Sequence, residues 1–281
     1  SGSAGSVTLN GAELNGVLSS GLQPQQRLFS LADTAAGLRA FITAATDGST
    51  AGTQLTLTGV SGITRTDTGA PIRVSVREFE FLRTQQAQGL TLPNRLLHIE
   101  DTQANLQRFI NTAFTGSALR AGTNLNSLAG FTTTDGLIDI SAQQLVAINA
   151  QRAAGLAFDV AAFRLVDTEA NLQSVVSGLA AGAAANDLTV VASLATASGS
   201  SSYPEYSPFY ATLTASQVVA LNGYLSAQPA NPSATQVRLI PPEIAGLSDS
   251  ASNISNLVLN AIDSTPLQLG FLRSVHGCLL Y

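Results

Sequence analysis

Asp101-Thr-Gln-Ala-Asn-Leu106 and Asp167-Thr-Glu-Ala-Asn-Leu172 are two copies of one six-residue pattern, and this pattern decides the fold. Related strings begin at Asp33 and Asp249, so the pattern occurs four times along the chain. An aspartate is a good N-cap, and its negative charge suits the positive end of a helix dipole. Apolar residues at helical spacing follow each copy. We therefore expect a helix to begin at each motif, with these four aspartates as its structural caps.

A second pattern alternates with the first. It consists of a short apolar alternation, a cap residue, and Glu or Gln three residues later, as in Ile138-Asp-Ile140 followed by Ser141 and Gln144. Alternation with a period of two residues predicts a strand. A cap followed three residues later by Glu or Gln is a capping box, which predicts a helix start. The second pattern therefore predicts a strand, a tight turn and a helix. Its caps are Asn10, Ser75, Ser141 and Thr214.

Both patterns recur with a period of roughly 65–80 residues, and a fixed period is the signature of a repeat architecture. Strands that alternate with helices favour the α/β class. We therefore expect an α/β repeat protein of four strand–helix–strand–helix units, stacked as a solenoid or as a string of small subdomains. The expected units span residues 1–66 (with a degenerate start), 67–134, 135–203 and 204–281 (with a C-terminal apolar tail).

Apolar residues at helical spacing follow the caps, and we expect them to be buried at equivalent places in the four units. The predicted core residues are Leu38, Phe41, Leu106, Phe109, Leu172, Val175, Ile254, Leu257, Phe79, Leu82, Leu145, Ile148, Val218 and Leu221.

Composition limits the possible partners. Charged residues make up only 11% of the chain, all thirteen basic residues are arginines, and the net charge is −5. Affinity for nucleic acids depends on neutralising phosphates, so we expect no nucleic-acid partner. No apolar run approaches the roughly 20 residues that a membrane helix needs, so we expect no membrane insertion. The single cysteine, Cys278, cannot form an internal disulfide bond.

The sequence lacks the short motifs of common catalytic and cofactor sites, such as HExxH, CxxC, Walker A, GxGxxG and G-x-S-x-G. We therefore expect no enzyme, no catalytic residues and no cofactor. Asp67 and Asp135 are candidate calcium ligands, because calcium prefers oxygen donors. Both lie in Thr- and Gly-rich strings that are also typical of turns, and the turn is the favoured interpretation.

Two segments are candidate interaction sites. The first is an aromatic insertion between residues 203 and 210, where a loop offers side chains for binding. A loop that folds back onto apolar surface is the favoured interpretation of the same residues. The second is the apolar C-terminal tail, which we expect to pack either on another subunit, as an added strand, or back onto the fourth unit. The candidate residues are Tyr203, Tyr206, Phe209, Tyr210, Leu267, Leu269, Phe271, Leu279, Leu280 and Tyr281.

The alternation of the two patterns resembles the tandem repeats of very large bacterial cell-surface proteins, namely S-layer-like proteins and giant adhesins. The resemblance covers nearly the whole chain, from Val7 to about Leu259. The residues that match best are Asp101, Asn105, Asp167, Asn171, Ser141 and Gln144. It implies repeats that serve as spacers or lattice modules.

These observations lead to one expected function and one alternative. We expect a non-enzymatic structural module of an exported bacterial surface assembly: an S-layer, a sheath, a matrix filament or an adhesin stalk. Its expected location is extracellular, at the bacterial cell surface. Its expected partners are further copies of itself, joined through its ends, and other surface proteins or glycans. The alternative is an extracellular binding module that recognises a glycan or a protein through the Tyr203–Tyr210 insertion.

Overall fold

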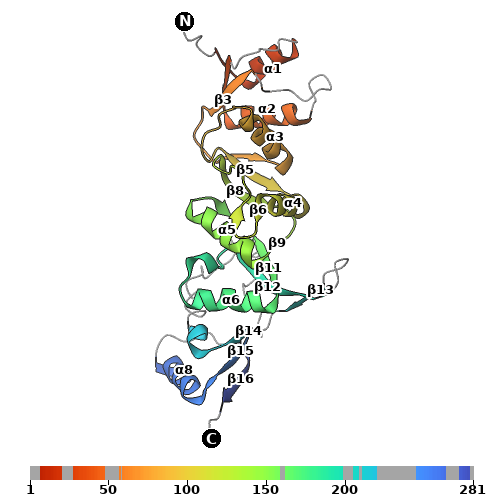
Figure 1. Ribbon diagram of the computed structural model, residues 1–281. Helices are drawn as coiled ribbons and strands as arrows, with labels where there is room; N and C mark the ends of the chain where they lie inside the picture. Colours follow the sequence, from red (N-terminus) through yellow and green to blue (C-terminus); the bar gives the residue numbers. More distant parts are fainter. Residues whose placement is uncertain are drawn as a thin grey trace. The chain divides into compact units, whose positions relative to one another are not determined.

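The computed structural model describes residues 7–20, 28–47, 57, 59–158, 162–198, 205–208, 211–219, 245–263 and 272–278 (Figure 1). Over these ranges the chain is a mixed α/β protein with open, mainly parallel sheets. The predicted α/β class is therefore confirmed.

The same order of elements occurs four times: a first strand, a first helix, a second strand, a second helix and a third strand. The first strands are β1 (Val7–Leu9), β4 (Ile72–Val74), β9 (Ile138–Ile140) and β14 (Ala211–Leu213). The first helices are α1 (Gly11–Ser19), α3 (Val76–Ala87), α5 (Ala142–Ala153) and the helical residues 215–219. The second strands are β2 (Phe29–Asp33), β5 (Leu97–Asp101), β11 (Phe163–Asp167) and β15 (Ala245–Ser250). The second helices are α2 (Ala35–Asp47), α4 (Gln103–Ala113), α6 (Glu169–Ala180) and α8 (Ala251–Asp263). The third strands are β3 (Val60–Arg65), β8 (Leu128–Thr133), β12 (Val191–Ser198) and β16 (Leu272–Cys278).

Each repeat forms its own small parallel sheet, in which the second strand lies between the first and the third. The strand register is the same in every copy. Phe29 of the first repeat pairs with Val7 and with Val60, and the pairing with the third strand then skips one residue, so that Ser30 faces Gly62. The other three repeats make the same skip at the same place. A bulge of this kind changes the local direction of a strand. Because it occurs at the same place in all four copies, the copies share one backbone plan.

A few elements are added to the common plan. The hairpin of β6 (Phe114–Thr115) and β7 (Ala118–Leu119) follows α4, and β10 (Ala157–Phe158) joins β8 at the edge of the second sheet. The strand β13 (Glu205–Pro208) pairs antiparallel with β12, and a short 3₁₀ helix, η1 (Ala184–Asn186), follows α6.

Contacts within the chain divide it into two compact units. One comprises residues 1–109, 121–135 and 155–157, and the other comprises residues 110–120, 136–154 and 158–281. The division runs through the second and the third predicted units, because residues 110–120 belong to the second compact unit and residues 155–157 to the first. The boundaries of the four predicted units stay a prediction.

The cores are built as the helical spacing predicts. Phe79 of α3 meets Phe109 of α4 edge to face, with 5.6 Å between ring centroids, and Phe109 also contacts Phe131 of β8. The predicted core residues within the described ranges are buried, except Ile254, which is half-buried. Leu221 lies outside the described residues.

The capping boxes of the first helices are confirmed. In α3 and α5 the side chains of Ser75 and Ser141 accept the N–H of the third helical residue. The side chains of Glu78 and Gln144 in turn accept the N–H of the cap. Asn10 makes the same box at the start of α1. Thr214 and Gln217 exchange the equivalent hydrogen bonds.

Candidate functional site

The four repeated aspartates are not the N-caps that the sequence predicted. Each aspartate belongs to the second strand, and the next residue is the cap, because a Thr or Ser hydroxyl accepts the N–H three residues on. Thr168 is the N-cap of α6 in this way. The same bond is made by Thr34, Thr102 and Ser250.

Each aspartate carboxylate instead ties together two helix starts. Oxygen Oδ1 accepts the N–H of the Thr or Ser cap of the second helix, at 2.7–2.8 Å. Oxygen Oδ2 accepts the first N–H of the first helix, at 2.8–2.9 Å. The carboxylate therefore joins the first and second helices of its own repeat.

The asparagine of the motif completes this arrangement within its own repeat. Asn105 Nδ2 donates to Asp101 Oδ1 at 2.8 Å, and Asn171 and Asn253 donate to Asp167 and Asp249 in the same way. The first repeat has Gly37 at this position. A Cβ placed there would lie 2.3 Å from Cγ of Asp33, so the aspartate carboxylate fills part of the space. The asparagine therefore orients the carboxylate that joins the two helices.

The hydrogen bonds change the acidity of these carboxylates. Burial raises the pKa of Asp101, but the bonds from Asn105, Val76 and Thr102 together lower the pKa more, and it lies below its ordinary value. For Asp249, the N–H of Ala215, the side chain of Asn253 and the N–H of Ser250 likewise lower the pKa. Both carboxylates are therefore held in the charged, hydrogen-bond-accepting form.

A second set of contacts joins one repeat to the next, and we call it the junction. The helix α2 contacts β4 and α3 of the following repeat, and α6 contacts β14 in the same manner. At each of the three junctions the Glu or Gln of a capping box also reaches a polar residue of the preceding second helix. Thr43 Oγ1 donates to Glu78 Oε1 at 2.9 Å. Gln144 Nε2 donates to Asn111 Oδ1 at 3.3 Å, and Gln217 Nε2 donates to Ser177 Oγ at 2.8 Å.

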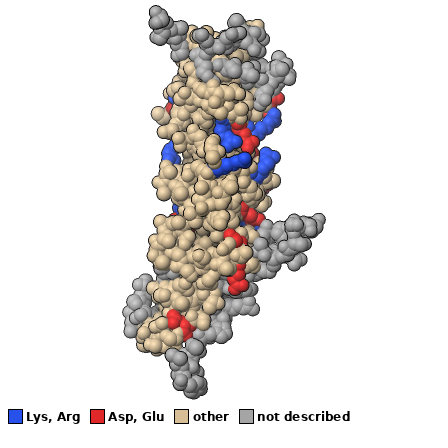
Figure 2. Space-filling model, in the orientation of Figure 1, with Lys and Arg blue, Asp and Glu red and all other residues tan. Residues whose placement is uncertain are grey.

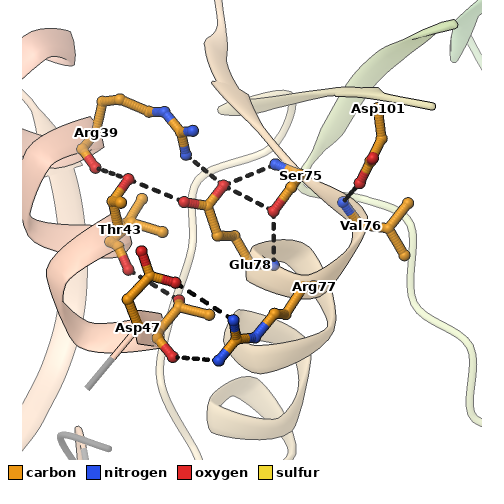
Figure 3. A network of polar contacts seen from close by, with 10 residues as sticks. Arg39, Thr43, Asp47, Ser75, Val76, Arg77, Glu78 and Asp101 are labelled. Atoms are coloured by element: carbon orange, nitrogen blue, oxygen red, sulfur yellow. Dashed lines mark hydrogen bonds and ion pairs between the residues drawn. The ribbon is translucent and has the colours of Figure 1, made fainter. Parts of the chain in front are cut away.

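The junction between the first two repeats is the most highly charged (Figure 3). Glu78 accepts an ion-paired hydrogen bond from Arg39, in addition to its bonds with Ser75 and Thr43. Next to it, Arg77 donates to the carbonyl of Thr46 at 3.0 Å. Burial raises the pKa of Glu78, and the bonds from Arg39, Ser75 and Thr43 together lower it below the ordinary value. Glu78 is thus a charged, buried tie between α2 and α3.

The two calcium candidates are also used at helix starts. Asp67 Oδ1 accepts the N–H of Ala35 at 3.0 Å, and Asp135 Oδ1 accepts the N–H of Gln103 at 2.5 Å. A metal ion would have to compete with these N–H groups for the same oxygens. In the part of the chain that the structure describes, no three His, Cys, Asp or Glu side chains are grouped so as to hold a metal ion. A calcium role for either residue stays a prediction.

Most of the predicted interaction residues lie outside the described residues. These are Tyr203, Phe209, Tyr210, Leu267, Leu269, Phe271, Leu279, Leu280 and Tyr281. Tyr206 falls in β13, where its backbone pairs with Ala197 of β12. The insertion therefore adds one antiparallel strand to the sheet of the third repeat.

The sequence analysis did not predict the three residues that bond the capping-box side chains at the junctions, which are Thr43, Asn111 and Ser177. The sequence nevertheless contains a signal for them. Each lies ten residues after its motif aspartate, and each is a polar residue that directly follows two apolar ones. Comparing the same position across repeats identifies them, because a polar residue kept at one position beside a buried face needs a partner.

The surface in Figure 2 carries few charges, in keeping with the low charged fraction of the chain. Charge is unevenly distributed along the sequence. Residues 1–135 contain nine arginines and nine acidic residues, whereas residues 136–281 contain four arginines and nine acidic residues. The whole net charge of −5 thus belongs to the second half. Among the helices described, none is both long and apolar enough to cross a membrane.

Compared with protein-family models, with curated proteins and with solved structures, the chain has no match. The resemblance to the tandem repeats of bacterial surface proteins accordingly stays a prediction.

Proposed function

We propose that this chain is a non-enzymatic structural module of an exported bacterial surface assembly, such as an S-layer, a sheath, a matrix filament or an adhesin stalk. In this proposal consecutive repeats continue one another through the junction, as a solenoid or a string of small subdomains. The module would act at the cell surface with copies of itself, with other surface proteins or with glycans.

The observation that carries the proposal is that the repeated polar residues form hydrogen bonds that hold the helices and the repeats together. The motif aspartates join the two helices of a repeat, and the capping-box Glu and Gln residues join one repeat to the next. A repeated polar residue that accepts hydrogen bonds from helix N–H groups contributes to stability rather than to chemistry. Chains of this kind derive their stability from each unit and from its interfaces with its neighbours.

Electron microscopy of the purified protein tests the proposal. We expect ordered sheets or filaments, and immunogold labelling at the surface of the source cells. A protein that remains monomeric at all concentrations and binds a glycan saturably would contradict it.

The alternative is a binding module that uses the Tyr203–Tyr210 insertion. The added antiparallel strand β13 favours it, since this strand departs from the parallel plan of the repeats. A glycan array separates the two functions. Saturable glycan binding by the wild type that is lost in a Tyr206→Ala variant supports the alternative. Equal binding signals for the wild type and the variant count against it.

A further inference from the structure

Exposed apolar side chains lie at special positions in the repeats. The large apolar residues that are exposed within the described ranges are Val7, Leu28, Val219, Val258 and Leu259. Two of them belong to the start of the first repeat, in β1 and directly before β2. Two others lie on α8, the second helix of the fourth repeat. First strands and second helices are elements that form junctions elsewhere in the chain.

In the first repeat four exposed or half-buried residues define what we call the head face: Val7, Leu9, Glu13 and Leu28. Val7 is 53% exposed, whereas its equivalents Ile72 and Ile138 are 2% and 1% exposed. In the second repeat this strand and the following helix contact α2 of the repeat before. Glu13 is exposed in the same way, although its equivalent Glu78 is buried. The head face therefore has the residues that form one half of a junction in the later repeats, and among the described residues no second helix covers it.

In the fourth repeat three exposed residues of α8 define the tail face: Ser255, Val258 and Leu259. Val258 lies nine residues after its motif aspartate and is 46% exposed. The equivalents Ile42, Ile110 and Val176 of the earlier repeats are buried. Leu259 takes the place of Thr43, and Ser255 takes the place of Arg39, the ion-pair partner of Glu78. The tail face is therefore the other half of the same junction.

We propose that the tail face of one copy of this chain docks on the head face of a second copy, in the geometry of the internal junctions. The inference rests on the proposed function and names its interface. Val258 and Leu259 cover Val7 and Leu9 of the next copy. Because the two faces differ, the contact is heterologous: it is not the self-complementary contact of a two-fold dimer, and repeating it joins further copies into a ring or an open chain.

The polar part of this contact differs from that of the first internal junction. Ser255 is the donor that faces Glu13, and its hydroxyl is neutral, whereas Arg39 brings a positive charge to Glu78. Leu259 has no hydroxyl that could replace the hydrogen bond from Thr43. The contact between copies therefore lacks an ion pair, and covering the Glu13 carboxylate without a cation is a cost that the apolar residues must outweigh. The contact is for this reason weaker than the first internal junction.

Three single variants and one mixture test the proposal by sedimentation over a concentration series. Val7→Asp places a charge on the head face, and Val258→Asp places one on the tail face. Val219→Asp is the matched control, since Val219 is 49% exposed and its equivalents, Glu80 and Val146, stay partly exposed inside the repeats. The expected result is concentration-dependent assembly of the wild type and the control. The head and tail variants should each show a dissociation constant raised about tenfold or more, because burying an unpaired charge is unfavourable.

An equimolar mixture of Val7→Asp and Val258→Asp gives the decisive result. Each variant keeps one intact face, so the mixture should form a one-to-one dimer and stop there. Several results would overturn the proposal: a monomeric wild type, a control that disrupts as strongly, or a folded mixture that does not associate. Circular dichroism confirms that the variants are folded.

A fourth variant tests whether Ser255 faces Glu13, because it should raise the affinity between two copies. Ser255→Arg supplies the cation that Arg39 supplies inside the chain, so it should lower the dissociation constant by up to about fivefold. The same substitution together with Glu13→Gln should bring no gain, because the carboxylate is then missing. A constant unchanged by Ser255→Arg alone would show that Ser255 does not face Glu13.

The failure of this interface and the failure of the proposed function are distinguishable. If ordered sheets still form from Val258→Asp, the proposed structural function stands and only this interface is wrong. If the wild type instead stays monomeric and binds a glycan saturably, the structural function itself fails.

Discussion

Replacing Asp101 by Ala should destabilise the first compact unit by about 3 kcal/mol. The carboxylate accepts the N–H groups of Val76 and Thr102 and the side-chain amide of Asn105, each at 2.8 Å. A typical hydrogen bond contributes about 1 kcal/mol net, so the three bonds together give this figure. Two of the lost bonds serve helix N-termini, where a missing cap alone costs about 0.5–2 kcal/mol.

Thermal unfolding followed by circular dichroism at pH 7 measures the effect. For a unit of this size, 3 kcal/mol corresponds to a fall of about 10 °C in Tm. Asp101→Asn is the matched control, since it keeps one carbonyl oxygen and should lose less. A Tm within about 1 °C of the wild type would refute the view that this aspartate ties α3 to α4. Hydrogen exchange should place the loss in residues of that unit and leave α6 protected as before.

The same pair of proteins gives a pH test. The pKa of Asp101 is lowered in the folded state, and its unfolded value is about 3.9. A lowered folded pKa means that the stabilisation is fully present above the unfolded value and is lost as the pH falls through the folded value. The difference in stability between wild type and Asp101→Ala should therefore be constant above about pH 5 and shrink progressively below about pH 4. Glu78 and Asp187 also have lowered pKa values, but both proteins retain them, so they cancel in the comparison.

Two further predictions concern packing. Phe109→Ala should cost about 3–5 kcal/mol, because the ring is buried between Phe79 and Phe131, and an unchanged urea midpoint would show that this face is not a core. Gly130→Ala should destabilise by more than about 1 kcal/mol, since its Cβ would lie 2.6 Å from the carbonyl oxygen of Ala157. Gly16→Ala is the control on α1, where a Cβ meets nothing within 4 Å, and it should stabilise by up to about 1 kcal/mol. Equal effects of the two glycine variants on the urea midpoint would contradict the close approach of β8 and β10.

Local patterns were sufficient to predict the elements that depend on nearby residues. The strand Ile138–Ile140, the cap Ser141 and its partner Gln144 lie within seven residues, and the structure has them as predicted. The cap of the second helix was placed one residue too early, at Asp101, because Asp and Thr are both good caps and stand side by side. The parallel pairing of Asp101 with Thr133 extends the strand to include the aspartate, and that pairing is made with a residue far along the chain.

The contacts that the sequence did not predict are hydrogen bonds between residues far apart along the chain. The asparagine of the motif has a local partner, since Asn105 donates a hydrogen bond to Asp101 at its own helix start. The link between repeats is made by Glu78, whose capping role was predicted and whose second role was not. A capping pattern specifies one partner of a side chain, whereas a second partner depends on which helix packs alongside. The role of Thr43 as a partner of Glu78 can be recognised only when the packing of α2 on α3 is known.

The side chains at each junction also determine which repeat can follow which. At the first junction Glu78 accepts hydrogen bonds from Arg39 and Thr43, whereas at the third junction Gln217 donates to Ser177. A glutamate cannot donate in its charged form, and the third repeat has Gln173 in place of Arg39. The first helix of the second repeat would therefore lose its cationic partner if it followed the third repeat. A buried carboxylate without a cation is costly. Repeats that share one backbone plan are thus not interchangeable, and the side chains at each junction select the neighbour that the chain supplies.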